Sequence, residues 1–95
     1  MTMDTKALLA EAEALKPQLL TDRRTLHRDP EVGPSLPHTA AYVTERLTAL
    51  GYTPRPLAGG VVADITGEDT GRCVLLRADM GALRVREATG LDFQS

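Results

Sequence analysis

Residues 74–84 read Val-Leu-Leu-Arg-Ala-Asp-Met-Gly-Ala-Leu-Arg, and this stretch is the most informative part of the 95-residue chain. An apolar run ends in a charged cluster, and Gly81 follows. Residues 73–76 show no alternation of polar and apolar side chains, which is typical of a strand covered on both faces. In α/β proteins such a strand commonly delivers polar residues to a site at its carboxyl end. We therefore predict a buried central strand over residues 72–78, with Asp79 as a candidate site residue.

Two further strands are expected before this segment. Residues 61–65 are rich in β-branched side chains, and the turn-forming residues 67–71 lead from them into residues 72–78. We predict that these two segments pair as an antiparallel β-hairpin. Residues 52–57 are extended, but Pro54 and Pro56 in this segment cannot donate ladder hydrogen bonds, so it is an edge strand at best. Gly59-Gly60 is expected to turn the chain between the first two segments.

Two amphipathic helices are expected to precede the strands. The first covers about residues 4–28, where apolar side chains recur at helical spacing. Pro17 interrupts it, so either the helix kinks there or a second helix begins with Pro17 in its first turn. The second covers about residues 36–50, with Ser35 as the expected cap, Pro37 in the first turn and Gly51 as the left-handed terminating residue. Its apolar stripe consists of Leu36, Ala40, Val43, Leu47 and Leu50. The fold class is α/β, in one small domain over residues 1–95.

The composition excludes several classes of function. Hydrophobic residues make up 42% and aromatic residues 3%, so the core must be built from Leu, Val and Ala. The net charge of -2 argues against a nucleic-acid partner, which would require basic residues clustered on one face. The single cysteine excludes an internal disulfide and fits a reducing compartment. Neither a secretory signal nor a membrane helix of about 20 apolar residues is visible, so we expect a cytoplasmic protein.

Several motifs, in series and at matching spacing, resemble one family from about Leu20 onward. The chain is similar to the amino-terminal part of the metal-dependent amidohydrolases related to hippurate hydrolase, aminoacylase and auxin-conjugate hydrolase, in the di-metal peptidase superfamily. The segments that carry the resemblance are LHRDPEVG (26–33), TA (39–40), LGY (50–52), GVVA (60–63), LRADM (76–80) and EATGLDF (87–93).

The resemblance implies an enzyme that cleaves the amide bond of N-acyl or N-aroyl amino acids. Two divalent metal ions, zinc, manganese or similar, would polarise the amide carbonyl and activate a bridging water, with a glutamate as proton shuttle. In this family the metal ligands come from an H-x-C-G-H-D segment, a later pair of glutamates and two further histidines, all downstream of the position that matches Ser95. We therefore expect no metal site, no cofactor and no hydrolysis from these residues alone.

Within residues 77–84, the chain differs from the family pattern at two positions. Relatives usually read R-A-D-M-D-A-L-P where this chain has residues 77–84. Asp79 matches the first aspartate, whereas Gly81 replaces the second, which in relatives lies beside the metal site, and Arg84 replaces the proline. Loss of a carboxylate that supports a metal site typically costs about 10- to 100-fold in metal affinity or activity.

Other residues that could carry chemistry have simpler interpretations. Asp79 could be an active-site carboxylate or a strand-end residue that caps a loop. His27 is expected to pack or to cap at the negative end of the first helix, and His38 to be exposed without a role. Cys73 lies in an apolar segment and is expected to be a buried, inert thiol. A zinc site built from Cys73 and the two histidines lacks the paired spacing that such sites show, and the glycine-rich turns are not phosphate loops.

Three hypotheses remain open for the function. The chain is a catalytically incomplete amidohydrolase, one half of a split enzyme completed by a separate carboxyl-terminal fragment, or a small non-enzymatic interaction module. In all three, an unpaired apolar edge at residues 72–78 would be a template for self-association.

Overall fold

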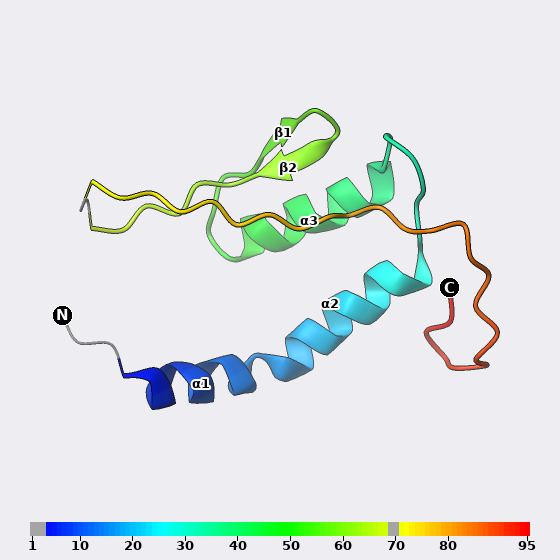
Figure 1. The fold of residues 1–95 in the computed structure, drawn as a ribbon, viewed down its shortest axis with the longest axis horizontal. Helices are drawn as coiled ribbons and strands as arrows, with labels where there is room; N and C mark the ends of the chain where they lie inside the picture. The colour runs from blue at the N-terminus through cyan, green and yellow to red at the C-terminus, as the bar shows by residue number, and fades with distance from the viewer. Residues whose placement is uncertain (1–3, 69–70) are drawn as a thin grey trace.

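The structure is a computed structural model that describes residues 4–68 and 71–95. Its elements are, in chain order, helices α1 (Thr5–Ala14), α2 (Lys16–Arg28) and α3 (Pro37–Ala49) and strands β1 (Arg55–Leu57) and β2 (Gly60–Val62). Figure 1 shows α1 leading into α2, and α3 with the β1–β2 hairpin beside it. Residues 71–95 return as an extended chain and turn near the carboxyl end of α2 (Figure 1). No helix among the described residues has the length and apolar character needed to cross a membrane.

The first predicted helix is two helices, because α1 ends before Pro17 and α2 begins at Lys16. Of the two predicted alternatives, a new helix with Pro17 in its first turn is therefore confirmed. A proline is tolerated there because the first-turn N–H groups have no partner within the helix. Asp4 caps α1, and its Oδ1 accepts a hydrogen bond from the Lys6 N–H at 3.0 Å.

The start of α3 differs from the prediction that Ser35 caps it. Leu36 occupies the cap position and has no capping side chain. Instead the carboxylate of Glu31 reaches the first turn, where it accepts hydrogen bonds from the backbone N–H groups of His38, at 3.0 Å, and Thr39. A carboxylate at this end is favourable because it satisfies unpaired N–H groups and opposes the positive end of the helix dipole.

The end of α3 is as predicted. Gly51 adopts a φ of 94°, in the left-handed region that favours glycine. The Gly51 N–H donates to the Thr48 carbonyl, and the Tyr52 N–H donates to the Leu47 carbonyl, both at 3.0 Å. Two of the last carbonyl groups of the helix are thereby satisfied, which fixes its boundary.

A polar contact joins α2 to α3. Asp22 Oδ1 accepts a hydrogen bond from the Tyr42 hydroxyl at 2.6 Å and lies 3.0 Å from Arg46 Nε. The Tyr42 hydrogen bond, with help from Gln18 and Arg46, outweighs the effect of burial and lowers the pKa of Asp22. Among the described residues only Leu36 and Thr39 are buried, and the last residue of the expected apolar stripe, Leu50, is 61% exposed. Apolar packing alone therefore does little to fix the two helices.

The hairpin forms one segment earlier than predicted. β1 pairs antiparallel with β2, with Arg55 opposite Val62 and Leu57 opposite Gly60. The expected pairing of residues 61–65 with residues 72–78 is wrong. The connecting residues Ala58 and Gly59 both have positive φ, at 49° and 84°, which is the turn geometry that matches the twist of a two-residue hairpin.

Residues 72–78 do not form the predicted central strand. They are extended but belong to no ladder, and Val74, Leu75 and Leu76 are 82%, 87% and 90% exposed. A strand requires a hydrogen-bonding neighbour, and the residues that the structure describes after β2 contain no strand to provide one. The described residues therefore fold into three helices and a two-stranded antiparallel hairpin.

Removal of the Tyr42 hydroxyl tests the polar contact between α2 and α3. Tyr42→Phe should lower the free energy of unfolding by about 1 kcal/mol, the usual contribution of one hydrogen bond, as measured by urea denaturation. Tyr52→Phe is the matched control, because its hydroxyl makes no hydrogen bond with any residue that the structure describes. Equal effects of the two substitutions would contradict this account of the helix pair.

The exposed apolar segment should make the isolated chain associate. We expect the sedimentation-equilibrium mass to rise with concentration, and Leu75→Glu to weaken this association about tenfold, since burial of one leucine contributes about 1.5–3 kcal/mol. Leu9→Glu, at a position 60% exposed on α1, should have little effect. A monomer with a sharp cooperative melt at high concentration would contradict the prediction.

Candidate functional site

Asp79 lies at the carboxyl end of the extended apolar segment, where the sequence places it, and it faces solvent. Its Oδ1 is 2.7 Å from Arg77 Nη2, and both side chains are more than three-quarters exposed. An ion pair this exposed contributes little to stability. At Gly81, an added Cβ atom would meet no atom within 4 Å, so the structure has room for an aspartate there, the residue that the family resemblance implies. Asp79 is therefore accessible to solvent at the end of this segment.

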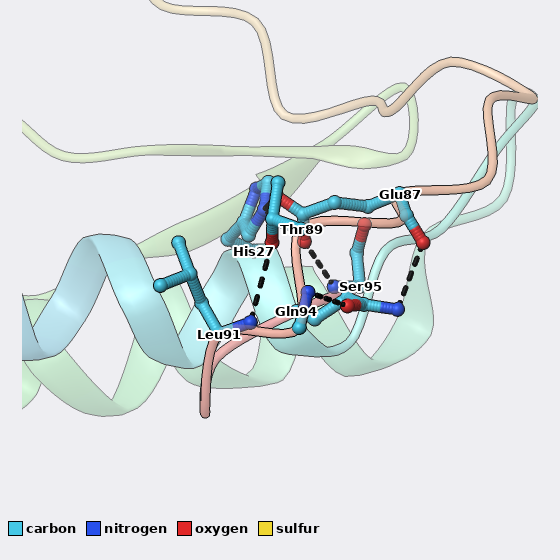
Figure 2. A network of polar contacts seen from close by, with 7 residues as sticks. His27, Glu87, Thr89, Leu91, Gln94 and Ser95 are labelled. Atoms are coloured by element: carbon cyan, nitrogen blue, oxygen red, sulfur yellow. Dashed lines mark hydrogen bonds and ion pairs between the residues drawn. The ribbon is translucent and has the colours of Figure 1, made fainter.

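The most connected polar cluster lies elsewhere, between α2 and residues 87–95 (Figure 2). His27 Nε2 is 3.1 Å and 3.2 Å from the two carboxylate oxygens of Glu87. The Ser95 N–H donates to Glu87 Oε2 at 2.8 Å, and the Gln94 side chain donates to the Glu87 carbonyl at 2.8 Å. The hydrogen bond from the Ser95 N–H and that from His27 hold the pKa of Glu87 below its usual value.

An aromatic contact reinforces this cluster. The guanidinium carbon of Arg24 lies 4.4 Å from the centroid of the Phe93 ring, an arrangement that favours a cation–π interaction. The His27 ring meets the same phenyl ring edge to face, with centroids 6.3 Å apart. His27 is thus a packed residue in the last turn of α2, as the sequence suggests, but its partner Glu87 was not predicted.

A second cluster surrounds the start of α3. His38 is exposed, as predicted, with Nδ1 3.1 Å from Asp29 Oδ2 and 3.9 Å from Glu31 Oε2. Partial burial tends to raise the pKa of Glu31, but the hydrogen bonds from Thr39 and His38 outweigh it, so the pKa is lowered. The cluster serves to hold a deprotonated carboxylate against the first turn of the helix.

Cys73 is exposed, which corrects the prediction of a buried thiol. The prediction required residues 72–78 to be covered on both faces, and no strand or helix covers them here. The structural zinc site considered from the sequence also does not form. Across residues 4–68 and 71–95, no three or more His, Cys, Asp or Glu side chains come together in a group that could hold a metal ion.

A shallow groove lies between α3 and the hairpin and was not predicted from the sequence. Its volume is about 450 Å³, and its lining is mainly proline, alanine and other apolar residues, with Arg55 as its charged residue. The Arg55 guanidinium is already paired with Asp64, at 2.8 Å. No nucleophile with an adjacent base lines this groove, so its surface suits apolar contact rather than catalysis.

The chain is similar in sequence to part of several known enzymes. The chain is 37% identical over 97 residues to an N-acetyl-L-cysteine deacetylase from Bacillus subtilis (strain 168), and the match spans 100% of this chain and 23% of that enzyme. It is 35% identical over 85 residues to an N-acyl-L-amino acid amidohydrolase from Geobacillus stearothermophilus, spanning 87% of this chain and 23% of the relative. The chain is homologous to part of the amidohydrolases, aminoacylases and carboxypeptidases.

The homology is partial. The chain spans about a fifth of the length of these enzymes and matches their amino-terminal part. It is also 41% identical over 80 residues to a putative glutamate--cysteine ligase 2-3 from Rhodococcus jostii (strain RHA1), where the match spans 82% of this chain and 10% of the relative. No family model and no solved structure matches the chain. The matches to the deacetylase and the amidohydrolase confirm the family resemblance inferred from the sequence motifs, over the amino-terminal part of those enzymes.

The contact of Glu87 with the Ser95 N–H and His27 should be lost in acid. Because the pKa of Glu87 is lowered in the folded chain, its contribution to stability is complete above the usual value of 4.5 and disappears as the pH falls through the lowered pKa. In ¹H–¹⁵N spectra, the Ser95 amide resonance should move over that range, and Glu87→Gln should reduce the movement to the part caused by the α-carboxyl group of Ser95 itself.

Glu45 provides the control for this titration, since it is an exposed carboxylate on α3. Glu45→Gln should leave the movement of the Ser95 resonance unchanged. Equal movement of the Ser95 resonance in the unchanged chain and in Glu87→Gln, between neutral pH and about pH 2.5, would contradict the contact.

Proposed function

We propose that these residues form the amino-terminal part of the catalytic domain of an enzyme that hydrolyses the amide bond of N-acyl amino acids. The observation that carries the proposal is the match of the whole chain to the amino-terminal part of an N-acetyl-L-cysteine deacetylase. Two of the three relatives described above are named for hydrolysis of N-acyl amino acids or N-acetylcysteine, which supports hydrolysis rather than ligation. The substrate class proposed is therefore a small N-acyl amino acid.

The exposed segment before Asp79 supports this assignment physically. Three consecutive apolar residues, Val74–Leu76, are more than four-fifths exposed, although apolar side chains of this size gain about 1.5–3 kcal/mol each on burial. In the proposal this segment is a strand that pairs with sheet strands of the remaining catalytic domain. The pairing would place Asp79 at the carboxyl edge of that sheet, where α/β enzymes build their sites.

The relatives are metal-dependent enzymes, but the residues described here do not form a metal site. In the proposal the metal ligands lie in the part of the relatives that this chain does not match, so that hydrolysis requires that part as well. The proposed role of Asp79 is to support that site from its edge.

The proposal implies a partner and a location. The partner is the complementing carboxyl-terminal portion of the catalytic domain, either in the same polypeptide or as the second half of a split enzyme. The single cysteine favours a reducing compartment, so we place the enzyme in the cytoplasm. The chain by itself would be an incomplete enzyme rather than an independent interaction module.

Complementation tests the proposed function. The chain is mixed with the part of the Bacillus subtilis deacetylase that follows the matched region, and release of cysteine from N-acetyl-L-cysteine is followed with added manganese, zinc or cobalt. We expect no turnover from either piece alone and measurable turnover from the mixture. Turnover by the chain alone above the metal-only blank would contradict the proposal, as would a stable complex without activity.

Variants of the chain make the complementation assay specific. Asp79→Asn should lower the rate about 10- to 100-fold, as expected for a carboxylate that supports a metal site, and Gly81→Asp should raise it. Asp64→Asn is the control, because Asp64 is likewise an exposed aspartate paired with an arginine. Equal effects at positions 79 and 64 would contradict the assignment of Asp79.

A further inference from the structure

Residues 87–95, which we call the docking loop, are held together by hydrogen bonds of their own (Figure 2). The Gln94 side chain closes the loop, because its Oε1 accepts from the Gly90 N–H at 2.6 Å and its Nε2 donates to the Glu87 carbonyl at 2.8 Å. The Gln94 N–H donates to the Leu91 carbonyl at 3.0 Å, and the Ser95 N–H donates to the Glu87 carboxylate at 2.8 Å. The shape of the loop is therefore fixed within the loop itself.

The docking loop makes fewer contacts with the helices than within itself. The docking loop meets α2 through the His27–Glu87 and Arg24–Phe93 pairs. The side chains of His27 and Glu87 are 38% and 19% exposed, so water reaches this contact. No residue of the docking loop is buried. Exposed polar pairs hold a segment less firmly than packed apolar side chains do, so the loop belongs to the least stable part of the structure.

The position of the docking loop matters for the chain that precedes it. The Ala82 N–H donates to the Glu31 carbonyl at 2.8 Å, which is the first anchor of the returning chain. The His27–Glu87 contact is the second. The residues between the two anchors, 83–86, include Arg84 and Arg86, which are both exposed.

We propose that the docking loop closes as one unit on the carboxyl-terminal turns of α2 and, when closed, holds the returning chain against the helices. Opening separates His27 from Glu87 and Arg24 from Phe93, while the hydrogen bonds within the loop stay intact. The closed state keeps residues 83–86 between two anchors, and the open state leaves them attached at Ala82 alone. The inference stands on these contacts and does not depend on the proposed hydrolytic function.

Limited trypsin digestion of the full chain tests this inference. Trypsin cleaves after Arg84 and Arg86, between the anchors, and after Arg77, which precedes both and serves as the internal reference. His27→Ala should raise the cleavage rate at residues 84 and 86 relative to residue 77 about threefold, the effect of losing one water-accessible hydrogen bond of modest strength. His38→Ala, the matched control in the other histidine cluster, should leave the ratio unchanged.

Two results would overturn the inference. One is an unchanged cleavage ratio in His27→Ala. The other is an equal acceleration at Arg46 in α3, which would show that His27 supports the whole fold rather than the docking loop. Gln94→Ala provides an independent variant, because it removes two hydrogen bonds within the docking loop without altering α2. It should raise the same ratio, and an unchanged ratio in this variant would contradict closure as one unit.

Discussion

The structure depends on Glu31, where separate parts of the chain meet. Its carboxylate accepts the first N–H groups of α3, from His38 and Thr39, and its backbone carbonyl accepts the Ala82 N–H from the returning chain. In a large protein such contacts would be secondary to a hydrophobic core. Here only Leu36 and Thr39 are buried among the described residues, so directional polar contacts set how the segments are placed. Arrangements of this kind are specific in geometry but only marginally stable.

Local signals in the sequence predict the helices well. Pro17 places the interruption of the first predicted helix, although the sequence does not decide between a kink and a new helix. Gly51 marks the end of α3, because few other residues adopt its φ of 94°. The side chain that caps α3 was predicted wrongly. Ser35 lies next to the helix in the sequence, whereas the carboxylate that accepts the first N–H groups belongs to Glu31, in a preceding loop. A sequence shows which residues can cap a helix but not how a loop folds back.

Non-local features could not be predicted in the same way. The absence of polar alternation in residues 73–76 indicates a strand covered on both faces, and that inference presumes covering elements that the described residues do not provide. The hairpin was assigned to residues 61–65 and 72–78, whereas the observed hairpin turns at Ala58 and Gly59, one residue before the turn predicted at Gly59-Gly60. The difference of one residue arises because Ala58 adopts a positive φ, which is rare for alanine. His27 and Glu87 are 60 positions apart, and nothing in the sequence around either residue indicates that they are in contact.

The proposed function explains both the exposed apolar segment, residues 72–78, and the partial homology. A segment that is apolar, extended and exposed has the properties of an interior strand before its neighbours are in place. The chain corresponds to about a fifth of the enzymes it resembles, so the neighbours would come from the rest of that domain. On this account the sequence prediction describes the segment as it lies in the complete enzyme, and the structure describes it without its partners.

Hydrogen–deuterium exchange of residues 72–78 tests this account most directly. It is measured by mass spectrometry for the chain alone and for the chain bound to the complementing portion of the deacetylase. The account predicts fast exchange of these backbone amides in the chain alone and strong protection in the complex, because ladder hydrogen bonds form only there. Equally fast exchange in both samples would contradict it, and so would protection already present in the isolated monomer.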